Sequence, residues 1–236
     1  MTRPILLDLF CGAGGAAVGY HRAGFDVIGV DIAPQPNYPF EFHQADALEV
    51  LALMTTWRSL EDTRAIHASP PCQLHSTQKT GVTGNYQDLI APVRDLLIAT
   101  GLPYVIENVV GAPLIDPLKL CGTSFGCIIE DAPPHPAGCD LQRHRLFESN
   151  LTLSGPPCAH SKQRRTLGVY GNAGHHDSPN RPSPPAASHR GWKAGKQRAR
   201  DLMGVDWEVT DRELAESIPP AFTHHIGLQM IEQLTT

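Results

Sequence analysis

One cysteine in the chain is placed as a nucleophile would be. Cys72 follows Ser69, Pro70 and Pro71 at the predicted carboxyl end of a strand, and a polar, glycine-bearing stretch comes after it. Open parallel sheets bind ligands beyond the carboxyl ends of their strands. The prolines stiffen the backbone before the thiol, and the stretch that follows can close over it. A lone cysteine is more often a buried structural residue, but this position favours a nucleophile.

A carboxylate is expected at the same edge of the sheet, and two arginines are expected on one face of a further strand. Glu107 ends another apolar run, and an acid beside an apolar wall has a raised pKa and can donate a proton near neutral pH. Arg143 and Arg145 alternate at the start of a further strand, so both could hold a phosphate or a carbonyl oxygen. The alternatives are a carboxylate that caps a helix and an exposed edge strand.

A glycine turn after the first strand suits a nucleotide-like ligand. Gly12, Gly14 and Ala17 match the pattern G-x-G-x-x-A, and Asp31 closes the next strand, where a carboxylate would meet ribose hydroxyls. The pattern fits NAD, a flavin or S-adenosylmethionine. A purely structural strand-to-helix turn is the alternative.

The elements that would position these residues alternate between strand and helix. Strands are predicted at 5–9, 25–30, 41–45, 64–68 and 104–107, and helices at 16–23 and 89–100. This alternation predicts an α/β fold with a doubly wound, mostly parallel sheet. Thr210 with Glu213 forms a predicted capping box, and Pro219 and Pro220 suit the first turn of a final helix that ends near Leu234.

Composition limits the remaining classes. The chain has 236 residues, of which 41% are hydrophobic, enough for one large core, and it contains neither a long repeat nor a membrane-length apolar run. Six cysteines without paired spacing suit a reducing, cytoplasmic setting. Net charge is only −5, but residues 142–200 carry 11 basic and 2 acidic groups, a local charge of +9. This segment predicts a polyanionic partner, with a solvated insertion as the alternative.

The remaining cysteines are candidates for a metal site. Cys121, Cys127, Cys139, Cys158 and His160 could converge, but none of the cysteines has C-x-x-C spacing. The sequence therefore favours no metal.

In order and spacing, these features resemble the C5-cytosine DNA methyltransferase family, in the form of a small phage or bacterial member. The resemblance covers roughly residues 4–150 and, more weakly, 196–234. It rests on Phe10-x-Gly12-x-Gly14-Gly15, Asp31, Asp46, Pro71-Cys72-Gln73, Glu107-Asn108-Val109 and Arg143-x-Arg145.

The resemblance implies a Rossmann-like fold that binds S-adenosylmethionine. Residues 1–150 would form the catalytic core, 151–195 a loop-rich, basic segment that contacts the target, and 196–236 C-terminal helices that pack back on the core. Asp31 would hold the ribose, Ile32 would lie against the adenine and Asp46 would meet its amino group. The full set of implied cofactor-binding residues is Asp8, Phe10, Gly12, Ala13, Gly14, Gly15, Asp31, Ile32, Asp46 and Pro71.

The resemblance also implies the reaction. Cys72 would add to C6 of a cytosine flipped out of double-stranded DNA, while Glu107 hydrogen-bonds N3 and the exocyclic amine. Arg145, with Arg143, would position the base oxygen and the neighbouring backbone. A restriction-modification context in a bacterial or phage-infected cytoplasm is expected, with no membrane and no obligate protein partner. The chain departs from the family at Leu141, where a Gln is usual, and at Ala215-Glu216, where a Gly-Asn pair is usual.

Three other functions are compatible with parts of the sequence. The same chemistry on transfer RNA is the nearest, because one branch of the family modifies RNA. An NAD-dependent oxidoreductase would explain the glycine turn and Asp31 but gives no role to Cys72 and Glu107. A non-catalytic DNA-binding protein would not need these two residues.

Overall fold

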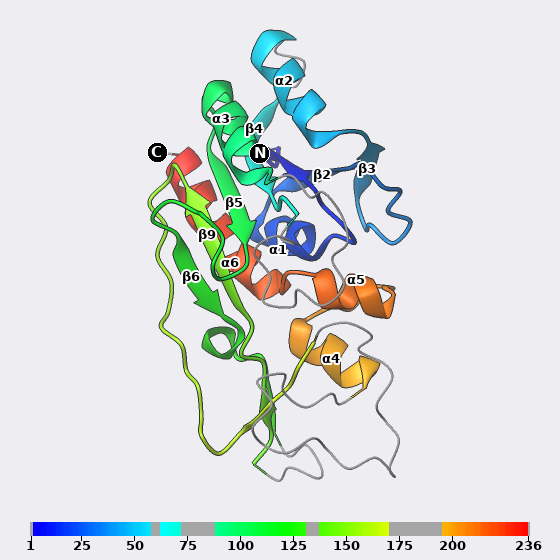
Figure 1. The fold of residues 1–236 in the computed structure, drawn as a ribbon, viewed down its shortest axis with the longest axis vertical. Helices are drawn as coiled ribbons and strands as arrows, with labels where there is room; N and C mark the ends of the chain where they lie inside the picture. Colours follow the sequence, from blue (N-terminus) through cyan, green and yellow to red (C-terminus); the bar gives the residue numbers. More distant parts are fainter. Residues whose placement is uncertain (1, 58–61, 72–87, 131–136, 170–194, 236) are drawn as a thin grey trace.

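The computed structural model describes residues 2–57, 62–71, 88–130, 137–169 and 195–235 (Figure 1). Cys72 and the part of the basic segment between 170 and 194 lie outside these ranges. Within the described ranges, no helix combines the length and the apolar character that a membrane span requires.

A seven-stranded sheet forms the centre of the molecule. Its order is β3-β2-β1-β4-β5-β9-β6, with the first five strands parallel and β9 antiparallel to both of its neighbours. A doubly wound sheet has a crevice where the strand order reverses, here between β1 and β4. The strands are β1 (Ile5–Leu9), β2 (Asp26–Asp31), β3 (Glu41–Gln44), β4 (Thr63–Ala68), β5 (Tyr104–Asn108), β6 (Leu118–Cys121) and β9 (His144–Ser149).

Helices cover both faces of this sheet. Because side chains alternate along a strand, Leu6 packs with α1 (Gly15–Ala23) and α6 (Pro220–Leu234), whereas Leu7 and Leu9 pack with α2 (Ala47–Trp57) and α3 (Ile90–Thr100). The helices α1 and α6 lie in close contact because Gly19 has no side chain. A Cβ there would overlap Thr223, whose hydroxyl donates to the Ala16 carbonyl at 2.8 Å.

A smaller lobe lies at one end of the sheet (Figure 1). It contains a second sheet of order β10-β8-β7, formed by β10 (Arg165–Thr166), β8 (Cys139–Asp140) and β7 (Ile128–Ile129). Strand β7 follows the short helix η1 (Gly122–Phe125) in the chain. Its core includes Leu167 and Val169 but also residues of α4 (Lys196–Met203) and α5 (Asp211–Glu216). The lobe thus draws on chain segments on both sides of 151–195.

The main elements predicted from the sequence are confirmed to within one residue at each end, and the α/β class with a mostly parallel sheet is confirmed. The Thr210–Glu213 capping box is present, and α6 begins at Pro220 and ends at Leu234. Helix α2, the small sheet and the antiparallel placement of β9 were not predicted.

Candidate active site

The glycine turn connects β1 to α1 at the carboxyl edge of the sheet. Phe10, Gly12 and Gly14 all have positive φ angles, of 56°, 49° and 88°. A Cβ on Gly12 would meet nothing within 4 Å, so the turn borders open space, whereas a Cβ on Gly14 would lie 2.6 Å from Pro39. Positive φ in a non-glycine residue such as Phe10 is uncommon and tends to occur at functional sites.

Two residues of the turn face the protein instead. Ala13 is buried, and its carbonyl accepts a hydrogen bond from the indole of Trp207 at 2.9 Å. A Cβ on Gly15 would lie 2.5 Å from the carbonyl oxygen of Ile218. These contacts fix the turn against the C-terminal segment.

Three more of the cofactor candidates follow β2 and β3. The Asp31 carboxylate accepts from the backbone N–H groups of Gly12 (3.1 Å) and Ala33 (3.0 Å), which holds it beside the glycine turn. Ile32 is 69% exposed, unusual for a large apolar side chain next to a buried strand. Asp46 accepts from the N–H of Leu48 at 2.7 Å and so caps the start of α2.

Glu107 and Arg145 meet at the carboxyl end of β5. In the antiparallel register Glu107 lies opposite Phe147, so Arg145 is its diagonal neighbour on β9, and its Nε lies 2.8 Å from Oε1 of the glutamate. Burial raises the pKa of Glu107, while the charges of Arg145 and Arg143 and a hydrogen bond from Ser69 lower it. The net pKa is raised, so Glu107 retains a proton to a higher pH than an exposed glutamate.

The end of β4 is tied to the end of β5 next to Glu107. The amide of buried Asn108 donates to the carbonyl of Pro70 at 2.9 Å, and the N–H of Ser69 donates to the Leu9 carbonyl at 3.1 Å. Pro71 is exposed and is the last described residue before Cys72. These two hydrogen bonds hold Ser69 and Pro70 next to the ends of β1 and β5, two residues before Cys72 in the case of Pro70.

Arg143 has a different environment from Arg145. Its guanidinium donates to the carbonyl oxygens of Val169 (2.9 Å), Ala215 (2.6 Å) and Ser217 (2.9 Å). It therefore joins the sheet, the small lobe and the link between α5 and α6. Neighbouring Glu216 pairs with Arg212 at 3.0 Å on the exposed side of α5.

A row of buried polar side chains behind the site was not foreseen. Asp8, His67 and Glu107 occupy β1, β4 and β5 on the sheet face that packs against α1. His67 contacts the Tyr20 hydroxyl through Nδ1 at 3.0 Å and the Ser69 hydroxyl through Nε2 at 2.8 Å. Because Ser69 also bonds Glu107, the chain Tyr20–His67–Ser69–Glu107 is continuous.

Burial favours the neutral form of each group in this row. It lowers the pKa of His67 to about 3, so the ring is a neutral imidazole that donates through one nitrogen and accepts through the other. Burial, with a small addition from the charge of Asp31, raises the pKa of Asp8 to about 8, against a hydrogen bond from Tyr38. Asp8 is fully buried on the core face and lies beside Tyr38, not at the open edge of the turn.

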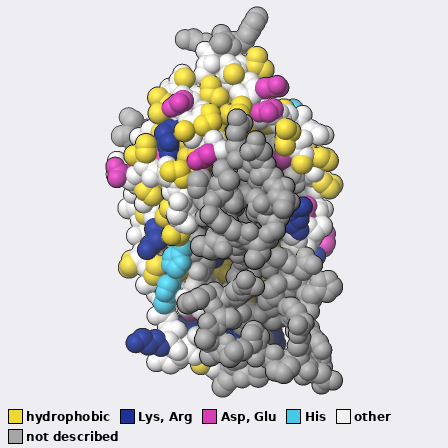
Figure 2. Space-filling model, in the orientation of Figure 1, with side chains coloured by type: hydrophobic (Ala, Val, Ile, Leu, Met, Phe, Trp, Pro, Cys, Tyr) yellow, Lys and Arg dark blue, Asp and Glu magenta, His cyan; other side chains and the backbone are white. Residues whose placement is uncertain are grey.

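The described part of the basic segment is largely engaged within the protein. Arg164 pairs with Glu130 at 2.5 Å and Lys196 with Asp211 at 3.7 Å, while Arg200 donates to the Trp207 carbonyl at 3.0 Å. In Figure 2 the Lys and Arg side chains stand at separate points of the visible face. The basic residues between 170 and 194 lie outside the described ranges.

Comparison with known proteins supports the same fold. No family model matches the chain. A stretch of 35 residues is 60% identical to the Type II methyltransferase M.XorII of Xanthomonas oryzae pv. oryzae, and it covers 14% of this chain and 8% of that enzyme.

Solved structures match over nearly the whole chain. A putative DNA modification methyltransferase from an E. coli prophage has a TM-score of 0.60 at 15% identity and covers 98% of this chain and 99% of its own. Dnmt2 methyltransferase of S. pombe has a TM-score of 0.56 at 13% identity, and the match covers 99% of this chain and 100% of the Dnmt2 chain. The methyltransferase EhMeth of Entamoeba histolytica has a TM-score of 0.56 at 13% identity, covering 99% of both. The chain therefore has the fold of these methyltransferases, in agreement with the resemblance carried by its sequence motifs.

Proposed function

We propose that the chain is an S-adenosylmethionine-dependent DNA (cytosine-5-)-methyltransferase. The observation that carries the proposal is the meeting of Glu107 and Arg145 beside the end of β4, from which the chain leads into Pro71 and Cys72. An acid with a raised pKa and a cation at one sheet edge, with a thiol next in the chain after Pro71, match the needs of an attack on a pyrimidine ring.

The carboxyl ends of β1 and β2 fit the methyl donor. The space beside Gly12 and the exposed side chain of Ile32 leave room for a nucleoside, and Asp31 stands between them. Asp31 would accept from the ribose hydroxyls and Ile32 would lie against the adenine. S-adenosylmethionine would supply an electrophilic methyl group on its sulfonium, and the neutral thioether S-adenosylhomocysteine would be the leaving group.

The residues of the chain would prepare the base for this methyl group. C5 of cytosine is a poor nucleophile, so the Cys72 thiolate adds to C6 and breaks the ring conjugation. Glu107 hydrogen-bonds N3 and the exocyclic amine, where charge develops, and Arg145 holds Glu107 and the base oxygen. C5 then takes the methyl group, and loss of the C5 proton with elimination of Cys72 restores the aromatic ring.

The structure disfavours one alternative function, an NAD-dependent oxidoreductase, and is compatible with another, methylation of transfer RNA. In the NAD-binding order of a doubly wound sheet the strands run parallel throughout, whereas here β9 is inserted antiparallel between β5 and β6, which disfavours an oxidoreductase. The same chemistry on transfer RNA uses the same site and stays as the alternative substrate.

Transfer of a labelled methyl group tests the proposal. The purified chain is expected to place label from S-adenosylmethionine on C5 of cytosine in duplex DNA, and Cys72→Ala is expected to abolish this while the cofactor still binds. Label in transfer RNA and none in DNA would overturn the assignment of substrate. Full activity of Cys72→Ala would overturn the mechanism.

A further inference from the structure

Four sulfur and nitrogen ligands converge beside the edge strand β6, which is separated from β1 by β4, β5 and β9. Cys121 ends β6 and His144 begins β9, and the antiparallel register places them directly opposite each other. Cys158 and His160 come from the chain that follows β9. One ligand atom of each of the four residues lies within 4.8 Å of all the others.

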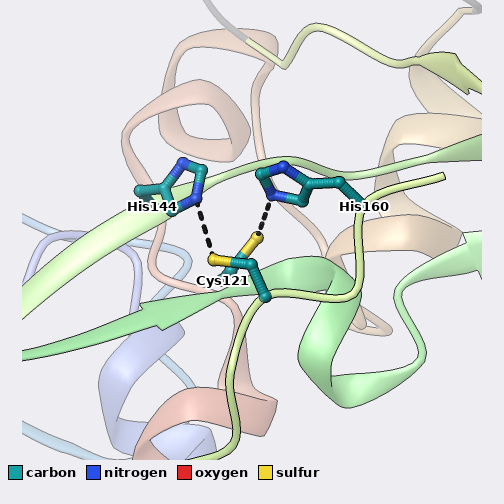
Figure 3. A group of neighbouring side chains, drawn as sticks. Cys121, His144 and His160 are labelled. Atoms are coloured by element: carbon teal, nitrogen blue, oxygen red, sulfur yellow. Dashed lines mark hydrogen bonds between the residues drawn. The ribbon is translucent and has the colours of Figure 1, made fainter. Parts of the chain in front are cut away.

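The distances are those of a site that a metal ion can close. Sγ of Cys121 lies 3.2 Å from Nε2 of His160, and Nε2 of His144 lies 3.3 Å from Sγ of Cys158. With Zn–S near 2.3 Å and Zn–N near 2.0 Å, a tetrahedral ion separates neighbouring sulfur and nitrogen ligands by about 3.5 Å. Figure 3 shows both imidazole rings turned toward sulfur atoms.

Separate contacts hold the Cys158–His160 turn in place. The Ser124 hydroxyl donates to the carbonyl of Pro157 at 2.7 Å, and the N–H of Ala159 donates to the Thr123 hydroxyl at 3.1 Å. The same Thr123 oxygen lies 3.1 Å from the sulfur of Cys121. Such contacts to ligands orient them and are typical of metal sites.

The chemistry of the ligand set selects the ion. Two thiolates balance the charge of a divalent cation, and two imidazoles with two thiolates in a tetrahedral arrangement favour zinc over magnesium or calcium. Four protein ligands leave no position for water or substrate, which is the form of a structural site. Cys121 is buried, whereas Cys158 and His160 are exposed, so an ion can enter from solvent.

We infer that Cys121, His144, Cys158 and His160 form a structural Zn²⁺ site. The site joins the edge of the sheet to the extended segment that runs from β9 toward the small lobe (Figure 1). It also fixes the first residue of β9, next to Arg145. This inference departs from the expectation of no metal and does not depend on the proposed reaction. Cys127 and Cys139, weighed for a metal on sequence grounds, lie in the core of the small lobe instead.

Metal analysis of the full chain tests the site. The protein, produced with zinc available and passed through a desalting column, is expected to retain about one zinc ion per chain by mass spectrometry of the elements. Cobalt(II) added after removal of zinc is expected to give the visible absorption of a tetrahedral thiolate site. Chelation of the zinc should lower the melting temperature.

Variants locate the ion. Cys158→Ala and His160→Ala remove exposed ligands and are expected to lower zinc affinity at least about tenfold. His43→Ala removes an exposed histidine from β3, at the opposite edge of the sheet, and Cys139→Ala removes a buried cysteine outside the cluster; both are expected to retain zinc. Cys72→Ala, expected to retain zinc as well, excludes the proposed nucleophile as a ligand.

Three results would overturn the inference. They are a wild-type chain that retains no zinc and gives no tetrahedral cobalt spectrum, zinc retained equally by Cys158→Ala and His160→Ala, and a Cys121–Cys158 disulfide in the protein as purified. The first result is measured on the wild-type chain. The inference can therefore be contradicted even if a variant fails to fold.

Discussion

Two buried glutamates on neighbouring strands have opposite surroundings. Glu148 on β9 receives Nε and Nη2 of Arg94 at 2.6 and 2.7 Å, and the N–H of Ile115 at 2.8 Å. Glu107 on β5 has Nε of Arg145 at 2.8 Å and the Ser69 hydroxyl, and its pKa is raised. The two residues are similarly buried, because Glu148 is 3% exposed and Glu107 is 6% exposed.

The number of donors, and not burial, distinguishes the two glutamates. A carboxylate that is fully supplied with donors serves as a structural ion pair that joins α3 to the sheet. A carboxyl that is buried with fewer donors, at the open end of a strand, has a raised pKa, which is typical of groups that take part in proton transfer.

The largest expected effect separates the two residues by activity. Glu107→Gln removes the acid and is expected to lower kcat of methyl transfer by at least about 100-fold, in the range for general acid catalysis. Its loss of stability is expected to be smaller than that of Glu148→Gln, because Glu107 has fewer donors. The matched variant Glu148→Gln should retain kcat per folded molecule. Steady-state assays on both variants check this, and equal losses of kcat would remove the distinction.

The second prediction concerns stability and reverses the ranking. Glu148→Gln leaves the guanidinium of Arg94 without its carboxylate and is expected to lower the free energy of unfolding by about 3 kcal/mol. Chemical denaturation measures this change. The double variant Arg94→Met, Glu148→Leu should recover part of the loss, because no buried charge remains. A Glu148→Gln variant as stable as the wild type would contradict the structural role.

The third prediction sharpens the comparison through pH and Asp8, which shares the face of the sheet with Glu107. The folded pKa of Asp8, about 8, lies above its ordinary value of 3.8. Between these values the unfolded chain has lost a proton that the folded chain keeps, so stability falls as pH rises, by up to about 1.4 kcal/mol per pH unit. Asp8→Asn should flatten this dependence, whereas Asp206→Asn, at an exposed position, should leave it unchanged. Denaturation curves at several pH values check the slope, and an unchanged slope in Asp8→Asn would contradict it.

The smallest expected effect concerns the hydrogen bonds behind Glu107. The Ser69 hydroxyl lowers the pKa of Glu107, so Ser69→Ala raises that pKa further and moves the alkaline limb of kcat/KM to higher pH. The accompanying loss of activity is expected to be about tenfold. Ser149→Ala, which removes a hydroxyl bonded to the Tyr104 carbonyl outside the site, is the control. A pH profile that does not move in Ser69→Ala would exclude a positioning role.

The sequence was informative where structure is local. The glycine turn, the ends of β2, β4 and β5, and the capping box of α5 each depend on residues close together in the chain, and the structure places them as predicted. The proximity of Glu107 to the end of β4 follows from the rule that parallel strands share an edge.

Long-range pairings were beyond such reasoning. Tyr20 and His67 are 47 residues apart and meet only because α1 packs on β4. His144 was overlooked as a metal ligand because its partner Cys121 is selected by the antiparallel register of β6 with β9. The different roles of Arg143 and Arg145 could not be predicted for the same reason. Arg143 bonds to the C-terminal segment, whereas Arg145 pairs with Glu107.

The proposed mechanism depends on a covalent bond between the sulfur of Cys72 and the target pyrimidine. Duplex DNA that carries 5-fluorocytosine at a methylated position, with S-adenosylmethionine, should trap this bond, because fluorine blocks the final loss from C5. We expect an adduct that survives denaturation, maps to Cys72 by mass spectrometry and is absent in Cys72→Ala. No adduct at a position that the wild-type protein demonstrably methylates would contradict it.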